Sequence, residues 1–235
     1  MSTRIETWKN QEVRSTSRPS PDESGVSEDL RVRQRVGIEL LLVASVGFGA
    51  GVLTAYGQGW LPHAIGSLAN SSGPWALVAF ALSLLASNRR AAALYGATTL
   101  GTLLLGYVIA SQALDHTTSH ALILFWGAAA LGLGPLLGVA ASWVRTERGV
   151  LAGLGAGAIS GILAGEGIYG LVYIADTTYP QYWWCEIALS ALLLGATAAF
   201  YRWRARTAVE ALVVAVLTAA LFVMVYLQDL ISVLQ

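Results

Sequence analysis

Residues 149–174 decide the class of this chain, because they read GVLAGLGAGAISGILAGEGIYGLVYI. Glycines recur at every fourth position, and a carboxylate follows the last of them: Gly149, Gly153, Gly157, Gly161, Gly165 and then Glu166. In a soluble helix each internal glycine costs about 1 kcal/mol relative to alanine. In a bilayer the chain must be helical regardless, because no water satisfies its backbone. The stretch therefore predicts a membrane helix with a smooth face that a second helix can approach closely.

The composition agrees with a membrane protein. The chain has 235 residues, 55% of them hydrophobic and 12% charged, whereas soluble domains carry about 25% charged residues. The single cysteine, Cys185, excludes an internal disulfide and a multi-cysteine metal site. Residues 1–34 are polar, and we expect a disordered cytoplasmic tail there. Residues 35–235 are expected to form a transmembrane helical domain.

Seven apolar runs are long enough to be candidate membrane spans. They cover residues 36–57, 73–88, 91–113, 119–144, 149–174, 183–201 and 207–230, and the second is the shortest. Arginine clusters precede the first span and follow the second, fourth and sixth, while the alternate loops contain neither arginine nor lysine. This alternation predicts an all-α bundle of seven transmembrane helices, with the N-terminus inside and the C-terminus outside.

The two halves of the chain resemble each other. GFGAG at residues 47–51 is similar to GLGAG at 153–157, and ALS at 81–83 recurs at 188–190. This pattern predicts a 3+1+3 parallel pseudo-repeat, an arrangement found in transporters. Chance similarity between segments rich in alanine, glycine and leucine is the alternative.

Glu166 is the main candidate for a functional residue, because ionisable groups inside a membrane are expensive and usually functional. Tyr169 and Tyr173 follow at helical spacing on the same face. We expect these side chains to line an outward-facing cavity for a small molecule, in which case Glu166→Gln would keep the fold and abolish ligand binding. The alternative is a neutral glutamate that hydrogen-bonds a neighbouring helix.

Aromatic and acidic residues gather near the outer ends of the spans. Trp183, Trp184 and Glu186 are the candidates to complete the ligand site, and the alternative is an aromatic belt at the lipid headgroups. The loop 115–120 holds one aspartate and two histidines, but a metal site is the less favoured interpretation, and no metal or cofactor is expected.

The glycine ladder is interpreted as a helix-packing surface. Its partner is either the first span, where Gly47 and Gly51 repeat the spacing, or another protein. Pro135 lies inside the fourth span and predicts a kink, because it cannot donate a backbone hydrogen bond. The chain has no P-loop, no Ser-His-Asp pattern and no zinc-protease motif, so no catalytic residues are assigned.

Four motifs carry a resemblance to a known family. They are YGQGWLP at 56–62, LANS at 68–71, GPLLG at 134–138 and GEG at 165–167. In these motifs the chain resembles a family of uncharacterised bacterial multi-pass membrane proteins, a domain of unknown function. The resemblance implies a bacterial plasma-membrane location and no particular activity. More distantly, the chain looks like the substrate-binding subunits of vitamin transporters.

These observations favour a small-solute transporter, or the solute-binding subunit of one, with its cavity around Glu166. The alternative is a non-transporting scaffold that docks a membrane-protein partner or a second copy through the Gly149–Gly165 ladder. The expected partners are the lipid bilayer and a small solute, and no nucleic acid is expected.

Overall fold

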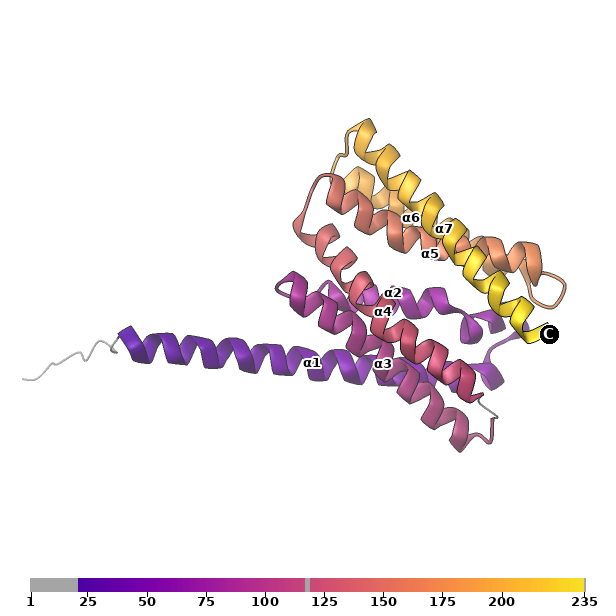
Figure 1. Cartoon of the computed structure of the whole chain (residues 1–235), viewed down its shortest axis with the longest axis horizontal. Helices are drawn as coiled ribbons and strands as arrows, with labels where there is room; N and C mark the ends of the chain where they lie inside the picture. Colours follow the sequence, from indigo (N-terminus) through magenta and orange to yellow (C-terminus); the bar gives the residue numbers. More distant parts are fainter. Residues whose placement is uncertain (1–20, 117–118, 235) are drawn as a thin grey trace, which may run out of the picture. The chain divides into compact units, whose positions relative to one another are not determined.

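The computed structural model describes residues 21–116 and 119–234, and all regular secondary structure in this part of the chain is helical (Figure 1). The elements are α1 (Pro21–Trp60), the 3-10 helix η1 (His63–Asn70), α2 (Ser72–Ser83), α3 (Arg89–Ala113), α4 (His120–Thr146), α5 (Val150–Tyr173), α6 (Pro180–Phe200) and α7 (Ala205–Leu234). Six helices are long and apolar enough to cross a membrane, with α1 contributing Gln34–Trp60 and α7 contributing Ala205–Gln228. The chain is therefore a multi-pass integral membrane protein.

The chain divides into two compact units, and the candidate site lies in the second, Glu39–Gln235. The first unit ends at Ile38. Residues 1–20 of the expected disordered tail lie outside the described residues. Residues 21–34 of the expected tail are assigned to α1, and the division at residue 34 stays a prediction.

The second expected span is shorter than predicted. Helix α2 has 12 residues and is about 18 Å long, against a hydrocarbon core of about 30 Å. Its last residue is Ser83, and the side chain of Asn88 then caps α3 by accepting a 2.9 Å hydrogen bond from the backbone N–H of Ala91. Six long helices and one short helix thus replace the seven full spans that were expected, and the seven-span prediction is not confirmed.

Helix α2 is nevertheless central to the second unit. It packs against α3, α4 and α5. Its buried face forms one apolar cluster with residues of α4 and α5: Ala76, Ala79, Phe80, Leu137, Ala140, Ala141 and Ile159. A short helix with core on several sides is held in place by its neighbours, so its N-terminal end is fixed inside the protein.

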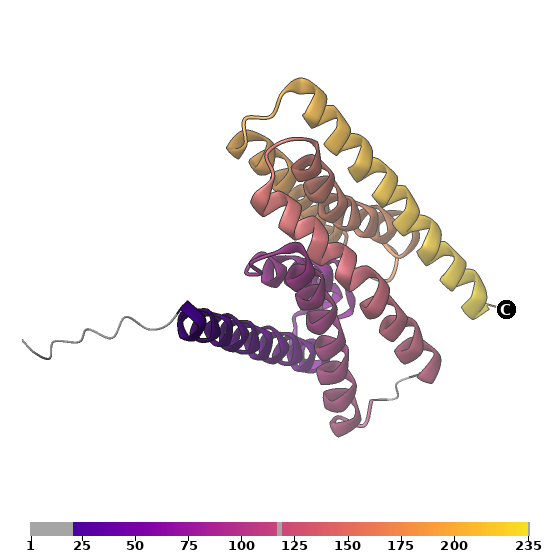
Figure 2. The same ribbon diagram turned by 60° about the vertical axis from the view of Figure 1, so that its left-hand side comes forward.

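The glycine ladder of α5 packs against α7, and the two helices lie side by side in Figures 1 and 2. A Cβ atom added at Gly161 would lie 2.5 Å from the carbonyl oxygen of Ala215, and one at Gly165 would lie 2.9 Å from that of Ala219. Gly153 and Gly157 meet Thr207 and Ala211 in the same way, whereas Gly149 has no described atom within 4 Å. The partner expected for this surface was the first span or another protein, and this expectation is wrong because α7 already covers it.

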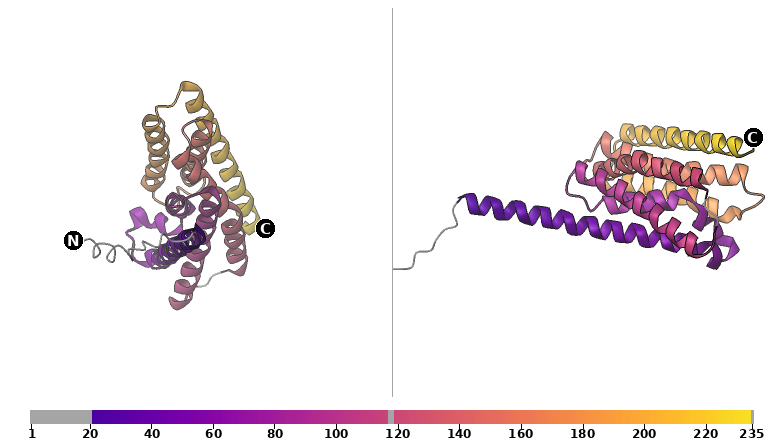
Figure 3. Two further views of the ribbon diagram at one scale, coloured as in Figure 1. Left: turned by 90° about the vertical axis from the view of Figure 1, so that its left-hand side faces the viewer. Right: turned by 60° about the horizontal axis from the view of Figure 1, so that its bottom comes forward.

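The glycines of the first span have a different neighbour. A Cβ atom at Gly47 would lie 2.8 Å from the carbonyl oxygen of Thr99, and Gly51 faces the backbone of Leu103 and Tyr107, so this part of α1 packs against α3. Helix α4 remains helical through Pro135, and Gly134 and Gly138 on either side of it contact the backbone of α3. In the right-hand view of Figure 3, α5, α6 and α7 run roughly along one direction, as membrane-crossing helices do.

Candidate functional site

The carboxylate of Glu166 binds the N-terminal end of α2. Its Oε1 atom accepts hydrogen bonds from the backbone N–H of Ser72 at 2.7 Å and from the Ser72 hydroxyl at 3.0 Å. Its Oε2 atom accepts from the backbone N–H of Gly73 at 2.5 Å and from the Ser71 hydroxyl at 2.8 Å. All four donors are thus directed at one side chain that is 3% exposed.

The local sequence explains why α2 needs this carboxylate. The first N–H groups of a helix have no partner within the helix, and an N-cap side chain usually satisfies one of them. Ser71 occupies the N-cap position of α2 but makes no such bond, since its hydroxyl is directed at Glu166. The anionic carboxylate takes over the capping role and also interacts favourably with the positive end of the helix dipole.

This contact lies at membrane depth. Helix α5 runs from Val150 to Tyr173, and Glu166 lies about 7 Å beyond its midpoint toward the C-terminal end. The N-terminus of α2 therefore begins within the apolar part of the bundle rather than at its surface. At this depth unsatisfied N–H groups would cost several kcal/mol, which gives Glu166 a clear structural role.

A second buried carboxyl, Glu186 of α6, lies next to the first. Its Oε1 atom is 3.2 Å from the Ser71 hydroxyl oxygen, and its Oε2 atom is buried and has no hydrogen-bond partner. Gly73 makes room for both carboxyls, because a Cβ atom there would lie 2.6 Å from Glu166 Oε2 and would also overlap Glu186 Oε1. Ser71 and Gly73 are thus the points where the two acidic side chains meet.

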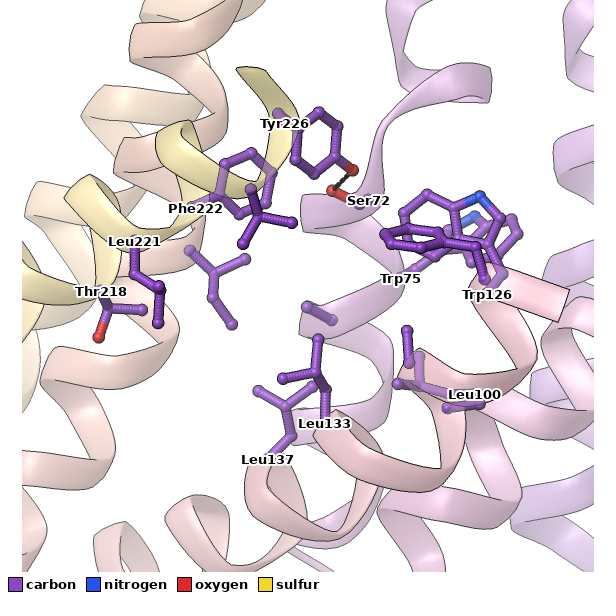
Figure 4. A pocket seen from close by; sticks show the side chains of 16 residues that line it. Ser72, Trp75, Leu100, Trp126, Leu133, Leu137, Thr218, Leu221, Phe222 and Tyr226 are labelled. Carbon is purple, nitrogen blue, oxygen red and sulfur yellow. Dashed lines mark hydrogen bonds between the residues drawn. The ribbon is translucent and has the colours of Figure 1, made fainter. Parts of the chain in front are cut away.

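Two cavities border the Ser71–Ser72 segment. The larger, about 210 Å³, is almost entirely apolar and opens between α4 and α7 (Figure 4). The smaller, about 190 Å³, also has polar walls formed by Gln58, Asn70, Ser71 and Tyr107. Both cavities share Ser72, Trp75 and Trp126, and the rings of the two tryptophans are 5.8 Å apart.

Ser72 connects the larger cavity with the carboxyl pair. Its hydroxyl donates to Glu166 and accepts a 2.8 Å hydrogen bond from the Tyr226 hydroxyl of α7, drawn as a dashed line in Figure 4. Phe222 and Tyr226 stack at 4.3 Å on the same wall. A ligand in this cavity would therefore find one polar end, formed by Ser72 and Tyr226, on an otherwise apolar surface.

The sequence-predicted ligand residues are placed less close together than expected. Tyr169 is buried and stacks on the half-exposed Tyr173 at 5.5 Å, and Tyr169 also contacts Tyr226 at 5.3 Å. Trp183 is buried against Gly170, whereas Trp184 is 61% exposed. None of these residues, and neither Glu166 nor Glu186, lines the two cavities described above. Glu166 and its helical neighbours therefore do not form the cavity wall that was expected. The carboxyl pair lies behind that wall, and the hydrogen bond from the Ser72 hydroxyl to Glu166 connects the two.

The sequence reasoning missed the residues that Glu166 binds, although a signal was present. Ser71-Ser72-Gly73-Pro74 combines N-cap residues with a proline in the first helical turn, which is typical of a helix start. The apolar run after it is too short for a full span, so these two facts together indicate a helix that begins inside the membrane. Trp75 and Trp126 carried no such signal, because tryptophans also occur in interfacial belts.

The segment 115–120 carries one aspartate and two histidines. No group of three or more His, Cys, Asp or Glu side chains in the described part of the chain is suitably placed for a metal ion. Thr117 and Thr118 of this loop lie outside the described residues. Asp115 adopts a left-handed conformation, φ 56°, where helix α3 ends.

Comparison with known proteins identifies a family whose function is unknown. A family model described as "Family of unknown function (DUF6518)" matches residues 31–231. No curated protein and no solved structure matches the chain. The likeness to vitamin-transporter subunits therefore has no support from these comparisons.

Proposed function

The chain belongs to the family of unknown function DUF6518, and we propose from its site that it is a small-solute transporter or the solute-binding subunit of one. The solute site is the pair of cavities that Trp75 and Trp126 share, and the buried Glu166 network is the polar element behind it. The observation that carries the proposal is the position of Ser72, which lines both cavities and donates a hydrogen bond to Glu166.

A broken membrane helix supports this proposal. In many transporters the substrate binds where a helix is interrupted near the midplane, because the free helix end offers unpaired backbone groups. Here η1 and the short α2 form such an interruption, and the cavities border it. The chain's own carboxylate already occupies the N–H groups of α2, so an anionic solute has no favourable place there.

The cavity walls indicate the class of solute. The larger cavity offers aromatic and aliphatic surface, and the smaller offers amide and hydroxyl groups of Gln58, Asn70 and Tyr107. Pockets of this kind bind a mostly apolar ligand and orient it through a few polar groups. We expect a neutral ring-bearing solute with one or two hydroxyl or amide groups.

Thermal-shift measurements on the purified full-length protein test this proposal. A panel of neutral ring-bearing alcohols and amides should contain compounds that raise the Tm, since a ligand of the folded state stabilises it. Trp126→Ala should abolish that rise because it removes the wall common to both cavities. Trp184→Ala is the matched control, since Trp184 is exposed and lines neither cavity. No stabilising compound, or equal stabilisation of Trp126→Ala, would overturn the proposal; uptake of a hit into proteoliposomes then separates a transporter from a binding subunit.

The topology is also a proposal: the N-terminus is inside, the C-terminus is outside, and α2 completes the return to the inner side. The alternating arginines support it. In a Cys185→Ser background, an impermeant maleimide added to intact cells should label Asp176→Cys and leave Arg148→Cys unlabelled. The reverse labelling would contradict this orientation.

The internal 3+1+3 repeat gains support from the helix contacts. In the first half, Gly47 and Gly51 face backbone atoms of Thr99 and Leu103 on the third helix of that half. In the second half, Gly153 and Gly157 face Thr207 and Ala211 on α7, again at a spacing of four residues on both helices. The unequal lengths of α2 and α6, 12 and 21 residues, are the main departure from a repeat.

The scaffold alternative has lost the surface on which it depended. A partner that docked on Gly153–Gly165 would have to displace α7.

A further inference from the structure

We propose that Glu166 and Glu186 form a proton-binding site, in which Glu186 holds one proton at neutral pH and Ser71 connects it to the ionised Glu166. This goes beyond the proposed transport function and does not depend on a solute in the cavities. The hydrogen-bond donors around the two carboxyls support this assignment.

Glu166 is the ionised member of the pair. Each of its oxygens accepts two hydrogen bonds, one from a backbone N–H group and one from a serine hydroxyl. An ionised carboxylate only accepts, whereas a protonated one must donate from one oxygen. With both oxygens occupied by donors and a helix N-terminus beside them, the site suits the anion.

Ser71 then requires a proton on Glu186. A serine hydroxyl has one hydrogen to donate and two lone pairs with which to accept. The Ser71 hydroxyl donates to Glu166 Oε2 at 2.8 Å, so its 3.2 Å contact with Glu186 Oε1 needs a hydrogen supplied by Glu186. The resulting chain of hydrogen bonds runs from Glu186 through Ser71 to Glu166.

The burial of Glu186 supports the same assignment. The side chain is 5% exposed, and its Oε2 atom has no hydrogen-bond partner. An ionised carboxylate with an unpartnered oxygen, next to a second carboxylate, would be strongly destabilised in this apolar setting. A neutral carboxylic acid leaves only one weak acceptor unsatisfied.

The other groups around the pair supply no compensating charge. On the packed elements, the neighbouring titratable side chains are tyrosines: Tyr182 of α6, Tyr169 of α5 and Tyr226 of α7. Helix α2 carries no titratable side chain, and η1 carries only the exposed His63 at its first position. Arg89 pairs with Glu147 and Arg206 pairs with Glu210, so neither of these arginines neutralises the carboxyl pair.

A proton fits this site better than a metal ion. Metal ions bind to oxygen lone pairs, and those of Glu166 that face α2 are already used by N–H and O–H donors. The pair also lacks a third carboxylate, histidine or cysteine among the described residues. The ligand of this site is therefore a proton, and Glu186 is its carrier.

Infrared spectroscopy of the full-length protein tests the proposal. At neutral pH, in a detergent without ester or carboxyl groups, the wild type should show the C=O stretch of a protonated carboxyl that shifts in D2O. Glu186→Gln should remove this band, while Glu147→Gln should leave it, because Glu147 lies at the surface in an ion pair with Arg89. Glu186→Gln resembles the protonated acid in shape and hydrogen bonding, so it should fold with an unchanged thermal-shift midpoint.

Two results would overturn the proposal: absence of the band in the wild type, or its persistence in Glu186→Gln. A band that disappears when Na⁺ or Ca²⁺ is added would instead assign the site to a metal ion. Because the measurement detects a proton and not a solute, its failure would leave the thermal-shift test of the cavities unaffected.

Discussion

Replacing Glu166 with glutamine should destabilise the protein although it changes only one atom. The amide offers one oxygen and one NH2 group where the carboxylate offered two oxygens. In either orientation the NH2 group faces the backbone N–H of Ser72 or of Gly73, which lie 2.7 and 2.5 Å from the carboxylate oxygens. The serine hydroxyls can rotate to adapt, but the backbone donor cannot.

Two contributions set the loss of unfolding free energy in Glu166→Gln. One buried N–H group left without an acceptor costs about 1–3 kcal/mol. Loss of the negative charge from the N-terminus of α2 adds up to about 2 kcal/mol in a partly buried setting. Together these give a loss of about 1–5 kcal/mol, against a total stability of about 5–15 kcal/mol for a typical protein. Glu186→Gln, by contrast, should be nearly neutral, because its oxygens receive no backbone donor.

Equilibrium unfolding in mixed micelles with increasing SDS measures these free energies, with tryptophan fluorescence as the signal. Glu147→Gln is the control for charge loss, since its exposed ion pair with Arg89 is worth about 0–1 kcal/mol. A loss below about 0.5 kcal/mol for Glu166→Gln, or an equal loss for Glu186→Gln, would refute the capping role assigned to Glu166.

Three further substitutions test the packing around the site by the same unfolding measurement. Gly157→Ala should cost about 1–3 kcal/mol because its Cβ atom overlaps the backbone of α7. Its control, Gly195→Ala, should be neutral or stabilising because no described atom lies within 4 Å of the added Cβ atom. Equal effects of the two substitutions would contradict close packing of α5 and α7. Gly73→Ala should destabilise more than Gly195→Ala, since its Cβ atom would overlap both carboxyls, and a neutral result would show that the pair is not held against α2. Tyr226→Phe should cost about 0.5–1.5 kcal/mol by removing one hydrogen bond to Ser72 while keeping the aromatic stack, and no loss at all would remove the link between α7 and the site.

The sequence predicted the long helices well because each contains an apolar run long enough to cross a membrane. It failed at α2, where hydropathy alone does not separate a half-length helix from a weak full span. The clue was Ser71-Ser72-Gly73-Pro74, a helix start too close to the following arginines for a membrane crossing from that point. A rule that combines capping residues with the length of the apolar run would have identified it.

The packing partner of α5 shows a different limit. Periodicity shows that one face of α5 is smooth, but it does not say which helix fills it. Helix α7 carries a matching row of small residues every four positions, Ala211, Ala215 and Ala219, and this row is visible in the sequence. Small residues on both surfaces, and not glycine on one, would have been the better criterion for the partner.

The candidate site could be predicted only in part, because its two halves are far apart in sequence. Glu166 stands out from its own segment as an ionisable residue in an apolar helix. Its partner Ser71 is 95 residues earlier, and nothing local connects the two. Glu186 was expected at the rim of a cavity and instead completes a buried pair, since an acidic residue six positions after Pro180 can lie on the outer or the inner face of α6.

The arrangement makes the start of α2 depend on the charge of one side chain. Glu166 accepts hydrogen bonds from the backbone N–H groups of Ser72 and Gly73 and from the hydroxyls of Ser71 and Ser72. Trp75, which lines both cavities, lies one turn further along α2. Neutralising Glu166 would weaken all four hydrogen bonds at once and release the end of α2 that carries Trp75. A proton moving from Glu186 to Glu166 would produce that neutral state. The same contacts that stabilise the helix therefore link protonation to the shape of the cavities, and they do so without any residue of the pair touching the solute.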